Sequence, residues 1–376
     1  MGVTRVGLHW DIFCKVVDNY GDIGVCWRLC RDLAARGEQV RLWTDDPSAL
    51  TWMAPGATLT DPGVQILPWL QDAEWPEPGD AVVEAFGCEL PLGCVRRMAA
   101  KPRPPAWINL EYLSAEPFAA RCHGLPSPVM HGPGQGLVKH FFYPGFTPGT
   151  GGLLREPRLS AQQAAFEASF ERSSWLKQLG LPAPTDATDA TDSSDKWVSL
   201  FCYEPLALSA LMQQLASRTK ERTHLLVTTG RATRAVQTIL NNKALIAAPT
   251  LPDQLSISYL PPLSQPDFDQ LLWACDLNFV RGEDSLVRAL WAGKPLVWQI
   301  YPQDDNAHQA KLDAFLTVMA ASPALRHWHH SWNGMNTAPL PALDALWGDR
   351  SMAAARQRLW RQDDLATQLV RFVKNR

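Results

Sequence analysis

The sequence predicts an α/β protein with two successive domains. Its 376 residues exceed the length at which a single hydrophobic core usually keeps growing. A strand–helix–strand pattern opens the chain, and a new series of strand patterns begins after a polar, low-complexity stretch at 182–195. Strands that alternate with helices are typical of parallel sheets, which bind ligands beyond the carboxyl ends of their strands.

The first domain is predicted over 1–181. It starts with a mostly apolar run at 5–14, as expected of a buried parallel strand. Val25, Leu29 and Leu33 then recur at a spacing of four, which places one apolar stripe on a helix. Further strands are predicted for QVRLWTDD, AVVEAF and AWINLEYL.

The second domain is predicted over 196–355, where WVSLFCYE, THLLVTTG and DLNFV read as strands with helical patterns between them. The stretch at 182–195 repeats Ala-Thr-Asp and has almost no apolar content, so we expect an exposed linker or loop. Residues 356–376 predict an amphipathic helix that could pack back on the first domain.

Composition excludes several classes of protein. The formal charge of −3 argues against electrostatic capture of nucleic acid. Eight cysteines without a CxxC pair are typical of reduced thiols rather than a disulfide framework. The sequence shows no run of 18 apolar residues and no signal-peptide pattern, so neither a membrane span nor secretion is expected. A cytoplasmic location is predicted.

The stretch VVDNYGDIGVCWRL carries two carboxylates, Asp18 and Asp22, at a predicted strand-to-helix turn. Nucleotide-binding folds usually have glycines there for a phosphate, which an acidic pair would repel. The pair therefore points to a cationic or proton-donating partner. The alternative is structural, with Asp18 in an Asx turn and Asp22 as a helix N-cap.

A second motif is LNFVRGEDSLVRALWAGKPLVW. A strand is predicted to end at Val280, with Gly282 in the turn and Asp284 or Ser285 capping a helix. The helix N-terminus, together with Arg281, would suit a diphosphate. The alternative is an ordinary helix cap with a surface ion pair.

These motifs support a resemblance to a known family. Strand, glycine turn, helix and AGKPLV are similar to the nucleotide-sugar half of GT-B glycosyltransferases. DNYGDIGVCWRL and FVRGEDSLVRALWAGKPLVWQIYPQ together closely resemble the protein-arginine rhamnosyltransferases that modify elongation factor P, the EarP family. The resemblance spans both halves and implies two Rossmann-like domains that face each other across a cleft.

The resemblance implies dTDP-β-L-rhamnose as donor and one arginine of elongation factor P as acceptor, with inversion at the sugar and relief of ribosome stalling at polyproline. It implies no metal and no other cofactor. Donor contacts are expected from Phe201, Tyr203, Gln265, Arg281, Asp284, Ser285 and Tyr301. Aromatic faces can stack on a base, and Arg and Ser can hold phosphates. For Phe201 and Tyr203 the alternative is core packing at a strand end.

The acidic pair suits this acceptor chemistry. A guanidinium is a poor nucleophile until a proton is withdrawn from it. Our hypothesis is that Asp22 is the general base and that Asp18 orients the guanidinium. Glu283 is a third candidate, which either binds hydroxyls of the donor or assists at the acceptor site.

Two further groups of residues are less distinctive. Asn109, Glu111 and Tyr112 follow a predicted strand and either contact the acceptor or have a simple strand-end role. Three histidines in RHWHHSW, residues 326–332, lack partners at a metal-ligand spacing, so a solvated loop is favoured over a metal site.

Two other functions stay open. The chain could be another nucleotide-sugar transferase with a small-molecule or glycan acceptor, although the Asp pair favours a cationic acceptor. It could also be a non-catalytic protein-binding module on a nucleotide-binding fold. That module would tolerate replacement of Asp18 and Asp22.

Overall fold

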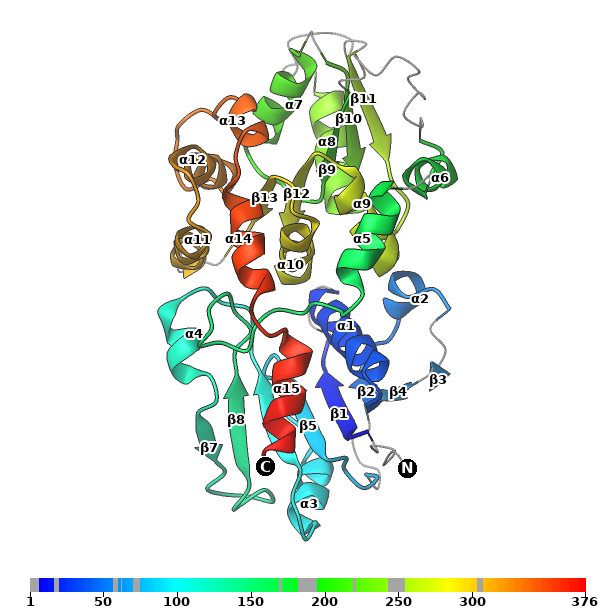
Figure 1. The fold of residues 1–376 in the computed structure, drawn as a ribbon, viewed down its shortest axis with the longest axis vertical. Coiled ribbons are helices and arrows are strands. Elements are labelled where there is room, and N and C mark those ends of the chain that lie inside the picture. Colours follow the sequence, from blue (N-terminus) through cyan, green and yellow to red (C-terminus); the bar gives the residue numbers. More distant parts are fainter. Residues whose placement is uncertain are drawn as a thin grey trace. The chain divides into compact units, whose positions relative to one another are not determined.

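The structure is a computed structural model that describes residues 7–16, 20–56, 60–61, 63–69, 75–168, 171–181, 195–218, 221–242, 254–302 and 307–376. The chain forms two compact α/β units (Figure 1). Unit 1 comprises Met1–Glu156 and Leu359–Arg376, and unit 2 comprises Pro157–Arg358. The chain therefore passes from unit 1 to unit 2 and back.

The first crossing lies after Glu156, whereas the sequence analysis places the boundary at 181. Helices α5 (Leu159–Ala168) and α6 (Glu171–Gln178) belong to unit 2. Phe166 of α5 and Trp175 of α6 contact each other, and Phe166 also contacts Trp273 of that unit. The linker predicted at 182–195 lies outside the described residues except for Asp195.

Unit 1 has a mixed sheet, whose described strands follow the order β3-β4-β2-β1-β5-β6-β8-β7. Neighbours pair in parallel except at the two edges, where β3 and β7 run antiparallel to β4 and β8. The strands are β1 (His9–Cys14), β2 (Gln39–Thr44), β3 (Thr60–Asp61), β4 (Val64–Pro68), β5 (Ala81–Ala85), β6 (Ala106–Leu110), β7 (Pro126–Pro128) and β8 (Val138–Phe142). The helices are α1 (Gly21–Ala35), α2 (Leu50–Met53), α3 (Leu92–Ala100), α4 (Pro117–Cys122) and α15 (Leu365–Lys374).

Hydrophobic cores cover both faces of this sheet. Strand β5 is buried at all five positions, as expected of a central parallel strand. One core joins the apolar stripe of α1 to that of α15, including Leu29, Leu33 and Leu369. The other packs Met98 of α3 against Trp107 of β6 and their neighbours. The predicted α1 stripe is thus part of the core, although Val25 is only partly buried.

The C-terminal segment contains two helices, not the single helix that the sequence analysis expects. Helix α14 (Ser351–Trp360) ends at Trp360, and α15 starts at Leu365 with Asp364 as its N-cap. Leu365, Leu369 and Val373 pack in the unit 1 core. The final helix therefore packs on the first unit, as its amphipathic pattern suggests.

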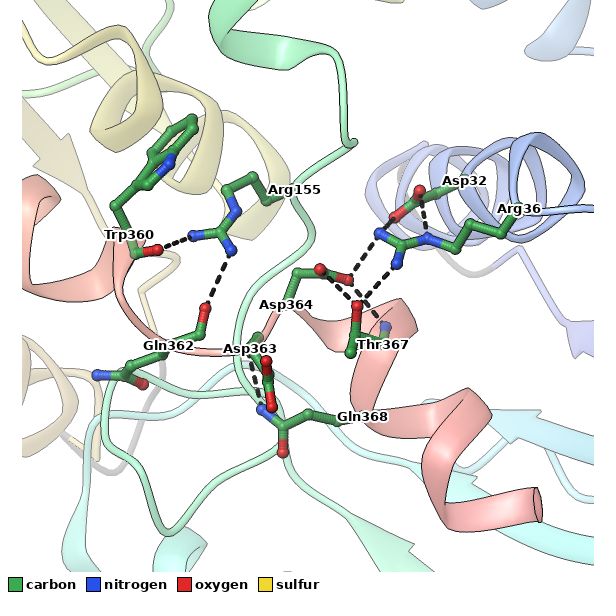
Figure 2. A network of polar contacts seen from close by, with 9 residues as sticks. All are labelled: Asp32, Arg36, Arg155, Trp360, Gln362, Asp363, Asp364, Thr367 and Gln368. Atoms are coloured by element: carbon green, nitrogen blue, oxygen red, sulfur yellow. Dashed lines mark hydrogen bonds and ion pairs between the residues drawn. The ribbon is translucent and has the colours of Figure 1, made fainter.

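Polar contacts hold this returning segment in place (Figure 2). Arg36 of α1 pairs with Asp32 at 2.9 Å and with Asp364 at 2.8 Å, and it donates to Thr367 Oγ1 at 2.7 Å. Arg155 donates to the carbonyl oxygens of Trp360 and Gln362 at 2.7 and 3.0 Å. Helix α15 is therefore fixed by a partly buried ion pair and by hydrogen bonds, as well as by its apolar face.

Unit 2 has a parallel sheet, whose described strands follow the order β11-β10-β9-β12-β13. They are β9 (Lys196–Leu200), β10 (Thr223–Val227), β11 (Leu255–Tyr259), β12 (Leu277–Arg281) and β13 (Leu296–Gln299). Besides α5, α6 and α14, the helices are α7 (Leu208–Ala216), α8 (Arg231–Asn241), α9 (Gln265–Ala274), α10 (Glu283–Ala292), α11 (Ala307–Val318), α12 (Pro323–Trp332) and α13 (Asp344–Trp347).

Each sheet has one point at which the strand order reverses. In unit 1 the chain proceeds outward from β1 through β2 on one side and from β5 on the other. In unit 2 the corresponding strands are β9 and β12. Ligands of open α/β sheets bind at this switch point, beyond the carboxyl ends of the strands. Both candidate motifs follow strands at these points.

The histidine-rich segment is a helix, not the solvated loop that the sequence favours. It forms most of α12, in which His329 is fully buried. The backbone N–H of Trp298 donates to His329 Nε2 at 3.1 Å, and His329 Nδ1 lies 3.0 Å from the carbonyl oxygen of Leu325. Amphipathic packing, in which one histidine faces the core, explains the difference.

Among the described helices, none combines the length and the apolar character that crossing a membrane requires. The eight cysteines all fall in described ranges, and none forms a disulfide.

Candidate active site

An arginine and two aromatic rings meet at the switch point of unit 2. Phe201 and Tyr203 follow β9, and Arg281 is the last residue of the neighbouring strand β12. The Arg281 Cζ lies 4.5 Å from the Phe201 ring centroid and 4.4 Å from that of Tyr203. Both rings thus support one guanidinium through cation–π contacts, and neither is simply a core residue.

Arg281 has a donor that lacks an acceptor. Its Nη1 is buried and finds no hydrogen-bond partner among the described residues. Burial lowers the pKa of the Arg281 guanidinium from its ordinary value, yet arginine stays cationic in proteins. A buried, unsatisfied donor on a cation is costly unless a ligand satisfies it. An anionic oxygen would meet this need.

Gly282 forms the turn that follows Arg281. Its φ of +70° is readily adopted only by glycine, and it is the N-cap of α10 without a side-chain hydrogen bond. The expectation that Asp284 or Ser285 caps this helix is therefore wrong. The Ser285 hydroxyl instead donates to the carbonyl oxygen of Arg281, one turn back. Glu283, Asp284 and Ser285 form the first turn of α10.

Trp298 fixes this turn from the next strand. Its Nε1 donates to the carbonyl oxygen of Gly282 at 2.8 Å. In the same first turn, Glu283 Oε1 accepts from Lys311 Nζ of α11 at 2.7 Å. The sequence analysis identifies neither Trp298 nor Lys311, because both reach the turn from elements outside the RGEDS motif.

Tyr203 is also enclosed from its other sides. Its backbone N–H donates to Gln299 Oε1 at 2.8 Å, and the Arg231 Cζ lies 4.9 Å from its ring centroid. Arg231 in turn pairs with Glu204. Burial raises the pKa of the Tyr203 phenol. Tyr301 meets the Tyr203 ring edge-on at 5.6 Å, while its own side chain is half exposed.

Gln265 is the first residue of α9 and is partly buried. Three residues later, Phe268 contacts the Phe201 ring edge-on at 5.5 Å. The sequence analysis does not identify Phe268, although its i+3 spacing from Gln265 is a signal that both lie on one helix face. Of the predicted donor residues, Phe201, Tyr203 and Tyr301 are joined to Arg281 or to each other, and Asp284 and Ser285 lie in the adjoining turn. Gln265 is connected to this cluster through its helix, by Phe268.

A second cluster lies at the switch point of unit 1. Asp22 is in the first turn of α1, which follows β1. Tyr20 is the N-cap, with no side-chain capping bond, so the structure does not bear out the N-cap alternative for Asp22. Asp18 lies outside the described residues, and its predicted role stays a prediction.

Tyr112 connects Asp22 to the far side of this switch point. Its hydroxyl donates to Asp22 Oδ2 at 3.3 Å. Its ring stacks on Phe86 at 4.7 Å between centroids, and Phe86 directly follows β5 with a φ of +56°. The Tyr112 side chain is nevertheless 45% exposed, so an aromatic face and a carboxylate are presented together.

Asn109 and Glu111 have a different arrangement. The Asn109 amide donates to Glu111 Oε1 at 2.6 Å, and Asn109 is buried at the end of β6. Burial raises the pKa of the Glu111 carboxyl, an effect that Asn109 partly offsets. Of the three predicted acceptor residues, the structure joins Tyr112 to Asp22 and pairs Asn109 with Glu111.

Within the described ranges, no three His, Cys, Asp or Glu side chains come together as a metal site would need. The expectation that no metal takes part stays a prediction.

Comparison with known proteins identifies the family. The family described as Elongation-Factor P (EF-P) rhamnosyltransferase EarP matches residues 10–374. The chain belongs to the EarP family. A protein-arginine rhamnosyltransferase of Pseudomonas putida is 44% identical over 97% of this chain and 98% of its own length. One of Pseudomonas aeruginosa is also 44% identical, over 86% of each chain.

Solved structures agree with this assignment. One solved structure is described as the structural basis for EarP-mediated arginine glycosylation of translation elongation factor EF-P. Its sequence is 32% identical to that of the present chain. It has a TM-score of 0.64 and covers 98% of this chain and 99% of its own. The glycosyltransferase SnogD from Streptomyces nogalater, 15% identical with a TM-score of 0.50 over 98% of this chain and 100% of its own, shares the fold alone. The chain has the predicted α/β fold of the GT-B class.

Proposed function

We propose that this EarP-family chain transfers rhamnose from dTDP-β-L-rhamnose to a guanidinium nitrogen of one arginine on elongation factor P, with inversion at the anomeric carbon. The observation that carries the donor half is Arg281. It ends a switch-point strand between two aromatic rings, with a buried Nη1 that lacks an acceptor among the described residues.

The donor site would hold a nucleoside diphosphate as follows. Arg281 and the N-terminus of α10 bind the diphosphate, because a guanidinium and a helix dipole both favour negative charge. Phe201 and Tyr203 supply aromatic faces for the base or for the methyl group of the deoxysugar. Further polar contacts come from Gln265 at the start of α9, from Asp284 and Ser285 in the first turn of α10, and from Tyr301 just beyond β13.

The acceptor half rests on Asp22. In the reaction, a bond forms between a guanidinium nitrogen and the anomeric carbon, and the bond from that carbon to dTDP breaks. The proton leaves the nitrogen and passes to Asp22 as general base. Tyr112 orients the Asp22 carboxylate through its hydroxyl. Asp18, whose role stays a prediction from the sequence, would orient and hold the cation. Arg281 stabilises the departing diphosphate, so no metal or other cofactor is required.

The modified factor would relieve ribosome stalling at polyproline, and a cytoplasmic place of action follows from that role. The partners are elongation factor P and dTDP-rhamnose, without direct binding of nucleic acid or membrane. A small-molecule or glycan acceptor is less well supported, since a carboxylate beside an exposed aromatic ring suits a cation. A non-catalytic binding module would not need a buried arginine whose Nη1 lacks an acceptor within the described ranges.

Intact mass spectrometry tests the proposal. Purified elongation factor P is incubated with this protein and dTDP-rhamnose, beside an acceptor whose target arginine is changed to lysine. A gain of one deoxyhexose on the first acceptor alone is expected. An unchanged mass on both, with dTDP-rhamnose still bound by the enzyme, would contradict the proposed acceptor and leave the donor site standing.

A further inference from the structure

An ion pair joins the candidate donor site to a helix outside the RGEDS motif. Lys311 Nζ of α11 lies 2.7 Å from Glu283 Oε1 of α10. Both side chains are largely buried, with 23% of Lys311 and 22% of Glu283 exposed. An ion pair with this limited exposure is screened less by salt than a surface pair.

Packing sets the position of Lys311. Its neighbour Leu312 is fully buried, and Phe315 one turn later meets the Trp298 ring edge-on at 5.2 Å. Trp298 also donates to the carbonyl oxygen of Gly282, the residue before Glu283. Helix α11 is thus tied to the turn through Trp298 as well as through Lys311. The ammonium group is held at the carboxylate by the fold and is not a mobile surface charge.

The negative charges in the first turn of α10 indicate a role for the ion pair of Lys311 with Glu283. Glu283 and Asp284 both lie in the first turn of α10, and Gly282 separates this turn from Arg281. A diphosphate that binds Arg281 and the helix N-terminus would approach these carboxylates and be repelled by them. Lys311 neutralises Glu283, so a cation from α11 makes an acidic turn compatible with an anionic ligand.

We propose that Lys311 is a positioning residue that fixes the Glu283 carboxylate and offsets its charge, so that the diphosphate of the donor binds at the RGEDS turn. This inference rests on the proposed function. It adds a residue on α11 to the donor site and explains how that site accommodates Glu283.

Binding of dTDP alone, measured by calorimetry, tests the charge balance. Lys311→Met removes the cation that pairs with the Glu283 carboxylate and should weaken dTDP binding about tenfold. Glu283→Gln in the same background removes that charge and should restore the affinity to near wild type. Lys311→Arg keeps the cation and should bind dTDP as wild type does.

Measuring the turnover number distinguishes positioning of the Glu283 carboxylate by Lys311 from simple compensation of its charge. The double variant Lys311→Met with Glu283→Gln should bind dTDP but lose most of its turnover, because both roles predicted for Glu283, binding hydroxyls of the donor or assisting at the acceptor site, need its carboxylate. Lys311→Arg should keep most of the turnover number. A matched control is Lys294→Met, which breaks the pair of Lys294 with Glu167 at 3.3 Å. Lys294 lies just beyond the C-terminal end of α10, so dTDP affinity should not change there.

The outcomes are distinct. If wild type and Lys311→Met bind dTDP equally, the inference is overturned while the proposed function stands. If the double variant binds as weakly as Lys311→Met, the pair only holds α11 in place, and the inference is again wrong. If wild-type protein does not bind dTDP, the proposed donor fails, and the inference fails with it.

Discussion

The Tyr112 hydroxyl donates to Asp22 Oδ2 at 3.3 Å, although 90 residues separate the two positions. Asp22 follows the first strand of unit 1, and Tyr112 follows β6, on the opposite side of the switch point. Stacking on Phe86 holds the Tyr112 ring in place. The side chain that we propose as general base therefore has a fixed donor on one of its oxygens.

Tyr112→Phe removes this donor and keeps the ring. We expect turnover to fall about three- to tenfold, because an exposed hydrogen bond to a carboxylate contributes roughly 1 kcal/mol. The dissociation constant of dTDP should stay unchanged, since Tyr112 lies in unit 1. Tyr112→Leu, which also loses the stacked ring, should be worse. Steady-state rates of elongation factor P modification give the comparison, and equal rates for Phe and wild type would contradict the orienting role.

Asp22→Asn tests the base itself. The amide keeps the shape of the side chain but cannot accept a proton, so turnover should fall by a factor of about 100 to 10,000. Calorimetry should still show dTDP binding close to that of wild type. Residual activity near the wild-type level would refute the assignment of Asp22 as general base.

Arg281→Lys tests the donor clamp. Lysine keeps a positive charge but loses the planar fork that lies over Phe201 and Tyr203. Affinity for dTDP should fall at least about tenfold, as expected when a charge-assisted bidentate contact is lost. Thymidine, which has no phosphate, should bind equally weakly to both proteins. An equal loss for thymidine and dTDP would mean that Arg281 shapes the base site and not the phosphate site.

His329 links protein stability to pH. Burial lowers its pKa from 6.5 to about 4, and Nε2 accepts from the Trp298 N–H. Between these values the unfolded chain binds a proton that the folded chain does not, so stability falls as the pH drops through this window. The contribution lost between pH 7 and pH 5 should be about 2 kcal/mol.

Chemical denaturation of wild type and His329→Gln at pH 7 and pH 5 measures the contribution of His329 to the pH dependence of the free energy of unfolding. The variant should be less stable than wild type at pH 7 and should lack this part of the pH dependence. His330→Gln is the matched control, because His330 is a neighbour that is only partly buried and pairs with Asp313. Parallel pH dependence in wild type and His329→Gln would show that the destabilising proton binds elsewhere.

Those parts of the fold that depend on local sequence patterns could be predicted from the sequence. The stripe of Leu29 and Leu33 and the glycine turn at 282 follow from helical spacing and from the conformational freedom of glycine. The shared position of Phe201 and Tyr203 beside Arg281 follows from their alternation beyond a strand. The domain boundary after Glu156 could not be predicted from the sequence. The apolar face of a helix such as α5 indicates that the helix packs against a core, but not which of the two cores it packs against.

The missed site residues have the same cause. Lys311, Trp298 and Phe268 reach the site from α11, β13 and α9, through packing between elements far apart in the sequence. A periodic pattern assigns each to a helix or strand without identifying its contact. For His329 the local sequence was misleading. Three nearby histidines suggest a polar loop, but the segment is a helix, and one face of that helix, which includes His329, packs in the core.

Arg36 pairs with two carboxylates, Asp32 of helix α1 and Asp364 at the N-cap of α15. Asp32 is fully buried, and burial raises its pKa from 3.8 to about 6 while Arg36 opposes that rise. Arg36→Met leaves this carboxyl without its cation and should reduce the free energy of unfolding by about 3 kcal/mol. The folded variant then binds a proton at Asp32 more tightly than the unfolded chain does, so the loss of stability should be larger at pH 8 than at pH 5.

Arg371→Met is the control. It breaks the exposed pair with Asp363, where the side chains are 60% and 50% exposed, and should cost less than about 0.5 kcal/mol. Equal losses in the two variants, measured by denaturant titration, would show that the contacts of Arg36 do not anchor α15.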